Sequence, residues 1–299
     1  MAERRLLFEG VAFTVGEFHC GPEDDRWARE NVIADGPQIV FPGTPVWIEY
    51  PGKHPIVADR NQVMFYNDGQ AYRRRLLADT GDHCVFVAMS PEWLRQVAAQ
   101  LDPSASAREG FRFPWTNAYV DGETFLLKER IIARLVNMSP GSEAEVQRAL
   151  FGMACRALAA AGRRPGPDLS SSRPATQRAR VEVVEATKAL LARHLDRRLA
   201  VACLAREVHL SPYQLASIFR GGTGLSIHEY HTQLRLRASL PRLRESQADL
   251  AGLAVSLGYR SHSHFTEIFR RTFGAPPSRA ARLLGEASNP GQVAGYGDW

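Results

Sequence analysis

Two sets of mostly polar side chains, spaced for the outer face of a helix, carry the clearest chemistry in the sequence. The first set is Tyr213, Gln214, Ala216, Ser217 and Arg220. The second set is His262, Ser263, His264, Thr266, Glu267, Arg270 and Arg271. Apolar residues at helical spacing separate the members, so we expect each set to point outward from a packed helix. Amide, hydroxyl and imidazole groups hydrogen-bond to base edges, and arginine neutralises phosphate, so both sets suit DNA.

The elements that must position these sets are repeated in the last third of the chain. Residues 204–224 and 253–274 each contain an alanine-bearing helix, a tight turn, a second helix that begins at serine, and a closing glycine. The offset between the copies is 49 residues before the turn and 50 after it. This pattern predicts two helix-turn-helix units in one domain.

Local signals define where the helices of this region begin and bend. Ser211 is suited to the N-cap of a helix, and Pro212 costs no hydrogen bond at its first position. A connecting helix is expected to open with a capping box at 226–229. Pro241 lies inside that helix and predicts that it ends near Leu240 or bends. His209 occupies the turn between the two helices of the first unit.

The net charge of +5 is divided unequally along the chain. Residues 1–162 carry 17 Lys and Arg against 21 Asp and Glu, a net of −4. Residues 163–299 carry 20 against 11, a net of +9. This division indicates an acidic part that avoids nucleic acid and a basic part attracted to phosphate.

The first part of the chain is β-rich and then helical. Expected strands at 11–15, 46–50, 63–66 and 84–87 are separated by Gly, Pro and Asn-Asp-Gly turns, which favours a sandwich or small barrel. A short helix is expected at 92–101, and two more within 123–161, the second opening with a capping box at Ser142 and Glu145. These two helices either cover a sheet or form a dimer surface, and we favour the dimer surface.

The composition also indicates where the two domains are joined and in which cellular compartment the protein works. Residues 163–175 are rich in Pro, Gly and Ser and are expected to be a flexible linker. No apolar run reaches the ~18 residues that span a membrane, and residues 1–9 hold no apolar signal segment. We therefore expect a cytoplasmic protein with no membrane partner.

Other groups of residues give weaker signals for a metal site, a reactive cysteine or catalysis. His262 and His264 point apart on a helix and have no thiol or carboxylate partner in the pattern, so we expect no metal there. His19-Cys20 and His83-Cys84 either form a sensor or metal site or are ordinary strand residues. Cys155 and Cys203 are expected to be buried. Phosphate loops and nucleophile elbows are absent from the sequence, so we expect no catalytic residue, cofactor or enzyme activity.

The repeated region resembles the DNA-binding domain of the AraC/XylS transcription regulators. The likeness lies in segments 210–220, 223–230 and 261–278. It implies that residues 213, 214, 216, 217 and 220 face DNA from the first unit, and residues 262, 263, 264, 266 and 267 from the second. Residues 1–162 look like that family's cupin-like effector domain with dimerising helices, partly through the segment 57–63.

Two questions about base reading stay open in the sequence. Ala216 and Ser217 are small, so the first unit reads bases through Tyr213 and Gln214 or relies on phosphate contacts. Glu267 either accepts from a cytosine amino group or orients an arginine. We expect the second unit to contribute more base contacts.

The expected architecture is α+β with two domains. Residues 1–162 form a β-rich effector and dimerisation domain, and residues 176–287 form an all-α double helix-turn-helix domain, followed by a tail at 288–299. The expected function is a sequence-specific regulator, an activator contacting RNA polymerase, which binds promoter DNA as a homodimer under control of a small effector. The alternatives are a ligand-independent regulator whose first domain only dimerises, a cysteine-based redox sensor, and a repressor.

Overall fold

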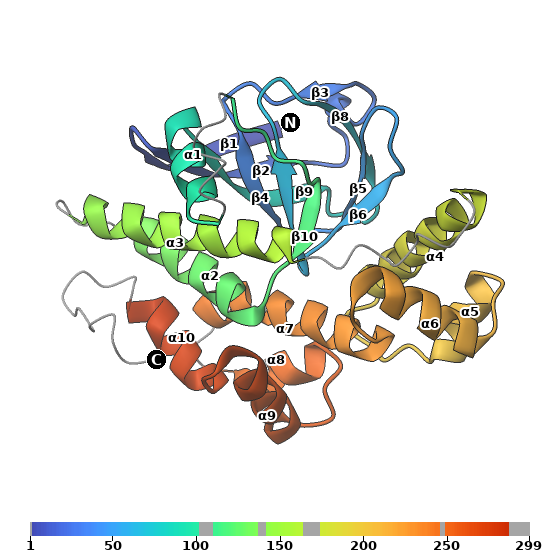
Figure 1. The fold of residues 1–299 in the computed structure, drawn as a ribbon. Coiled ribbons are helices and arrows are strands. Elements are labelled where there is room, and N and C mark those ends of the chain that lie inside the picture. The colour runs from blue at the N-terminus through green and yellow to red at the C-terminus, as the bar shows by residue number, and fades with distance from the viewer. Residues whose placement is uncertain (1, 102–109, 137–141, 164–173, 246–248, 287–299) are drawn as a thin grey trace.

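A computed structural model describes residues 2–101, 110–136, 142–163, 174–245 and 249–286. Two antiparallel sheets occupy one end of the molecule, and helices form the other (Figure 1). The larger sheet has the order β1 (Ala2–Glu9), β2 (Phe13–Cys20), β9 (Asp82–Met89), β4 (Gln38–Pro42), β7 (Gln62–Tyr66) and β10 (Asn117–Tyr119). The smaller sheet has the order β3 (Asn31–Val32), β8 (Ala71–Leu76), β5 (Val46–Glu49) and β6 (Ile56–Ala58), and a 3₁₀ turn η1 spans Asp25–Trp27.

The central strands of the larger sheet are buried on both faces. Ile39, Phe41 and Val63 belong to a cluster that packs against helices, whereas Val40 and Met64 belong to a cluster between the two sheets. Because side chains alternate along a strand, a central strand covered on both sides is apolar at every position. This accounts for the continuously buried runs in β4 and β7.

The β-rich region predicted from the sequence is confirmed, and its strands are more extensive than expected. β1 was not predicted, because residues 2–9 carry four charged side chains, and these lie on a strand at the edge of the larger sheet. The predicted short helix is α1 (Pro91–Ala99), capped by Ser90.

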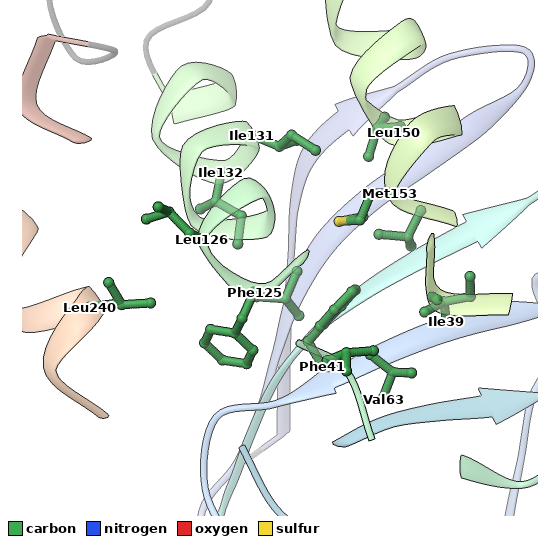
Figure 2. Packing of buried hydrophobic residues seen from close by; sticks show 14 of the residues in the cluster. Ile39, Phe41, Val63, Phe125, Leu126, Ile131, Ile132, Leu150, Met153 and Leu240 are labelled. Carbon is green, nitrogen blue, oxygen red and sulfur yellow. The ribbon is translucent and has the colours of Figure 1, made fainter. Parts of the chain in front are cut away.

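The two predicted helices of residues 123–161 are α2 (Gly122–Val136) and α3 (Glu143–Gly162). The capping box expected at Ser142 is wrong, because Ser142 makes no side-chain capping bond and Glu145 pairs instead with Arg134 of α2. Helix α2 lies between the sheet and the C-terminal helices, and Figure 2 shows Phe125 beside Phe41 and Leu126 facing Leu240. The apolar residues of α2 therefore pack within the chain.

The C-terminal helices follow the predicted order. They are α4 (Pro174–Arg193), α5 (Val201–Glu207), α6 (Pro212–Thr223), α7 (Ile227–Glu245), α8 (Leu250–Ser256), α9 (His262–Phe273) and α10 (Pro277–Glu286). Helix α7 continues through Pro241, so of the two alternatives predicted at this proline, an end near Leu240 or a bend, the end is wrong. Most of the expected linker and the tail at 288–299 lie outside the described residues.

Candidate functional site

Helices α6 and α9 are built alike because their buried residues repeat with the same spacing. Leu215, Phe219 and Thr223 are buried in α6, and Phe265, Phe269 and Phe273 are buried at the equivalent positions of α9. These i, i+4 and i+8 positions form one stripe on each helix. The remaining surface of each helix is therefore left to the polar sets.

Each helix has defined ends. Ser211 accepts a hydrogen bond from the Gln214 backbone N–H at 3.3 Å, and Ser261 accepts one from the His264 N–H at 3.2 Å. Gly224 and Gly274 close the two helices with φ of 76°. This left-handed conformation favours glycine, so the repeated glycine in the sequence has a structural cause.

The first polar set is exposed as predicted from the pattern. Tyr213 is 84% exposed, which is unusual for a large ring and leaves its face and hydroxyl open to a partner. Gln214, Ala216, Ser217 and Arg220 are exposed as well. The Gln214 Oε1 atom accepts a hydrogen bond from the Ser211 N–H at 3.1 Å as part of a capping box. This oxygen is therefore not free to contact a base, and only the Nε2 group of the Gln214 amide is left for that role.

The second polar set is exposed with two exceptions, Thr266 and His264. His262, Ser263, Glu267, Arg270 and Arg271 are exposed, and Thr266 is half-buried with its hydroxyl 3.5 Å from His262 Nε2. His264 is half-buried against Tyr259, with ring centroids 5.8 Å apart, and its Nδ1 atom is buried without a hydrogen-bond partner. The sequence did not indicate this contact, since Tyr259 lies in the preceding turn.

Positive charge at both helices is uncompensated. Within the described part of the chain, Arg220, Arg270 and Arg271 form no ion pair within 4.0 Å. Glu267 also lacks such a pair in those segments, so the structure shows no arginine oriented by this carboxylate. Three unpaired guanidinium groups beside exposed hydrogen-bonding groups can neutralise phosphates while neighbouring side chains meet base edges.

The two turns differ as the sequence suggested. His209 adopts φ of 55° in the first unit, and Gly258 adopts 69° in the second.

Cys203 of α5 is exposed, so its predicted burial is wrong, and Cys155 is half-buried. Leu204 and Ala205 form the packed side of α5, which leaves position 203 on the outer side.

The His-Cys dipeptides lie opposite each other but do not converge. His19 and His83 are cross-strand partners with ring centroids 6.3 Å apart, whereas Cys20 and Cys84 point to the other face of the sheet. Among the residues that the structure describes, no group of three potential ligands could hold a metal. Burial raises the pKa of both thiols, which disfavours the reactive thiolate.

A pocket of about 380 Å³ lies between the two sheets. Its apolar lining includes Val40, Ile48 and Met64, and its polar lining includes Tyr72 and Arg74. This size is within the range of small-molecule sites. The sequence predicted a binding domain but not these residues, because the pocket is formed by strands distant along the chain.

Buried hydrogen bonds connect the β-rich region to the helices. Asp59 Oδ2 accepts from the Tyr230 hydroxyl at 2.6 Å, and Asn61 Nδ2 donates to the Tyr230 carbonyl at 2.9 Å. Arg237 of α7 donates to the carbonyls of Arg60, at 2.9 Å, and Val120. Segment 57–63, singled out by its resemblance to the family, thus supplies several contacts between these parts of the chain.

Comparison with known proteins agrees with this arrangement. A helix-turn-helix domain model matches residues 204–282. A putative AraC-like transcription regulator of Streptomyces lividans is 38% identical over 91 residues, 30% of each chain. The regulatory protein SoxS of Salmonella typhimurium is 33% identical over 85 residues, which cover 28% of this chain and 79% of SoxS. The chain belongs to the AraC/XylS family of transcription regulators.

The family likeness is concentrated in the DNA-binding region. The chain matches about a third of the length of several other curated relatives. A solved structure of ToxT from Vibrio cholerae covers 91% of this AraC/XylS protein and 99% of its own chain, at 12% identity and a TM-score of 0.36. The family consists of transcription regulators and not enzymes. No helix within the described segments has the length and apolar character needed to cross a membrane.

Proposed function

We propose that this AraC/XylS protein is a sequence-specific regulator, an activator that binds promoter DNA in the cytoplasm through α6 and α9. The observation that carries the proposal is the pair of exposed polar helix faces, with Arg220 on α6 and Arg270 and Arg271 on α9, none of which has a carboxylate partner in the described segments. Tyr213 and the free part of the Gln214 amide would read bases in the first unit, and His262, Ser263 and Glu267 in the second. His264 would brace the second helix through Tyr259.

The division of labour follows the predicted domains. We assign effector binding to residues 1–162, which we regard as cupin-like, with the pocket between the sheets as the site. Residues 176–287 would bind DNA, joined by 163–175 and followed by the tail at 288–299. A homodimer and contact with RNA polymerase belong to the same proposal and rest on the family membership alone.

The test is selection of duplexes from a random library by the full chain, followed by affinity measurements over a range of salt. We expect enrichment of a defined sequence, and a changed preference for Tyr213→Ala with Gln214→Ala. The double variant Arg270→Gln with Arg271→Gln should flatten the plot of log affinity against log salt by ~0.9 per lost phosphate contact.

The matched control is Arg112→Gln in the β-rich region, which should leave that slope unchanged. Absence of any enriched sequence would refute sequence-specific binding. An unaltered salt slope in the Arg270 and Arg271 variant would remove α9 from the interface.

A further inference from the structure

Arg235 of the connecting helix α7 is a buried cation without a counter-ion. The residue is 5% exposed, and its Nε and Nη2 groups are buried and have no hydrogen-bond partner. Within the described segments, no carboxylate lies within 4.0 Å of this guanidinium group. Because arginine keeps its charge in proteins, both N–H groups need an acceptor to offset the cost of their removal from water.

The Tyr259 hydroxyl is a second buried group without a partner, and it lies near Arg235. Tyr259 follows the turn at Gly258 and is 7% exposed. Burial raises the pKa of Tyr259 and lowers that of Arg235, and each residue opposes the change in the other, so their polar ends are close. No hydrogen bond joins them. Polar groups that are close but not bonded to each other are commonly bridged by a third species.

The pair lies at the base of the second helix-turn-helix unit. The loop at 194–198, between α4 and α5, approaches the turn so closely that a Cβ atom on Gly258 would lie 2.5 Å from the Asp196 carbonyl oxygen. The Tyr259 ring packs against His264 in the first turn of α9, with centroids 5.8 Å apart. The turn that carries the Tyr259 hydroxyl thus connects this loop to the second recognition helix.

The charges around the pair leave one positive charge unbalanced. Arg198 and Asp196, both exposed on the loop, act on the charge of Arg235, and Arg198 also acts on Tyr259. His231, one helical turn before Arg235, does not alter this count, because burial and Arg235 lower its pKa to about 4 and keep it neutral at pH 7. Two arginines with one aspartate are balanced by one monovalent anion.

We propose that Arg235 and Tyr259 hold a small inorganic monoanion of chloride size at the base of the second helix-turn-helix unit. The groups without partners supply three donors, namely the Arg235 Nε–H and Nη2–H and the Tyr259 O–H. A water molecule has two lone pairs and accepts from only two of them, whereas a halide ion accepts from all three and supplies the missing charge. The ion fixes the turn before α9, so the stability of the second unit depends on it.

The experiment is thermal unfolding of the full chain at a constant ionic strength of about 0.2 M, with sodium gluconate replaced stepwise by sodium chloride. We expect the unfolding midpoint to rise by about 3 °C and then to saturate, because a ligand that binds only the folded state stabilises it. Arg235→Gln should abolish the rise, and Tyr259→Phe should weaken the apparent chloride affinity about fivefold. The control Arg242→Gln, at an exposed position of the same helix, should keep the full rise.

A second measurement on the unaltered protein observes the donor itself. The Arg235 Nε–H resonance, assigned by its loss in Arg235→Gln, should move downfield as chloride is added and saturate with the affinity found by unfolding. An equal rise of the midpoint in Arg235→Gln and Arg242→Gln, a rise with phosphate but not with chloride, or an Nε–H resonance that chloride does not move would overturn the proposal. DNA enters neither measurement, so both are independent of the proposed function.

Discussion

His231 of α7 is a buried histidine held in the neutral form. It is 6% exposed, and its Nε2 lies 2.8 Å from the His194 carbonyl, so Nε2 carries the proton that it donates. Burial, with a smaller effect of Arg235, lowers its pKa to about 4. Protonation would place a second charge near Arg235, which itself lacks partners for two guanidinium nitrogens.

The protein should therefore lose stability as pH falls from 6.5 to 4. Over that range the unfolded chain binds a proton at this site and the folded chain does not, so about 2 kcal/mol is lost between pH 7 and pH 5. His231→Gln keeps an N–H donor and should remove that part of the pH dependence in denaturant unfolding. His228→Gln, at an exposed position of the same helix, is the control. Equal pH dependence in both variants would contradict the assignment.

At the scale of elements, the repeat could be predicted because each helix carries its own signals. The helix boundaries of α6 and α9 follow from serine caps, a stripe of apolar residues and a closing glycine, all local in sequence. The half-burial of His264 could not be predicted as easily, because it depends on packing against the preceding turn. The capping box of Ser211 and Gln214 matches the Ser-x-x-Gln pattern, a signal that was not used in predicting this helix.

Two glycines of the repeat, Gly258 in the turn of the second unit and Gly224 at the end of α6, are under different constraints. A Cβ atom on Gly258 would lie 2.5 Å from the Asp196 carbonyl oxygen, whereas one on Gly224 meets nothing within 4 Å, although both residues have positive φ. Gly258→Ala should therefore lower the free energy of unfolding by about 2–4 kcal/mol, and Gly224→Ala by about 1 kcal/mol. Chemical denaturation measures both. Similar losses would show that the close approach to Asp196 contributes nothing.

At the scale of the whole molecule, the apolar core is continuous from the larger sheet to the second helix-turn-helix unit. One buried cluster contains Phe41 of the sheet, Leu126 of α2, Leu240 of α7 and Phe269 of α9. The sequence could indicate where the chain changes composition but not this packing, because contacts between distant segments leave no local pattern. For the same reason the Asp59, Asn61 and Arg237 contacts were not predicted.

Arg237 should be a main contributor to this interface. It is 1% exposed, donates to two carbonyls of the β-rich region, and burial lowers its pKa to about 10. Arg237→Met would leave both acceptors unsatisfied and should cost about 3 kcal/mol. We expect calorimetry to show separate transitions for the two parts of the chain. The control is Arg242→Met, which is exposed on the same helix, and a single unshifted transition in both would refute this role.

The close approach of α2 to α9 limits which parts of two such regulators can be joined in a chimeric protein. A Cβ atom on Gly122 would lie 2.6 Å from the Thr272 carbonyl oxygen, so the start of α2 and the end of α9 are fitted to each other. A chimera that joins this β-rich half to the DNA-binding half of another regulator would bring a new surface against Gly122. Exchange of halves between relatives therefore requires that α2 and α9 be transplanted together.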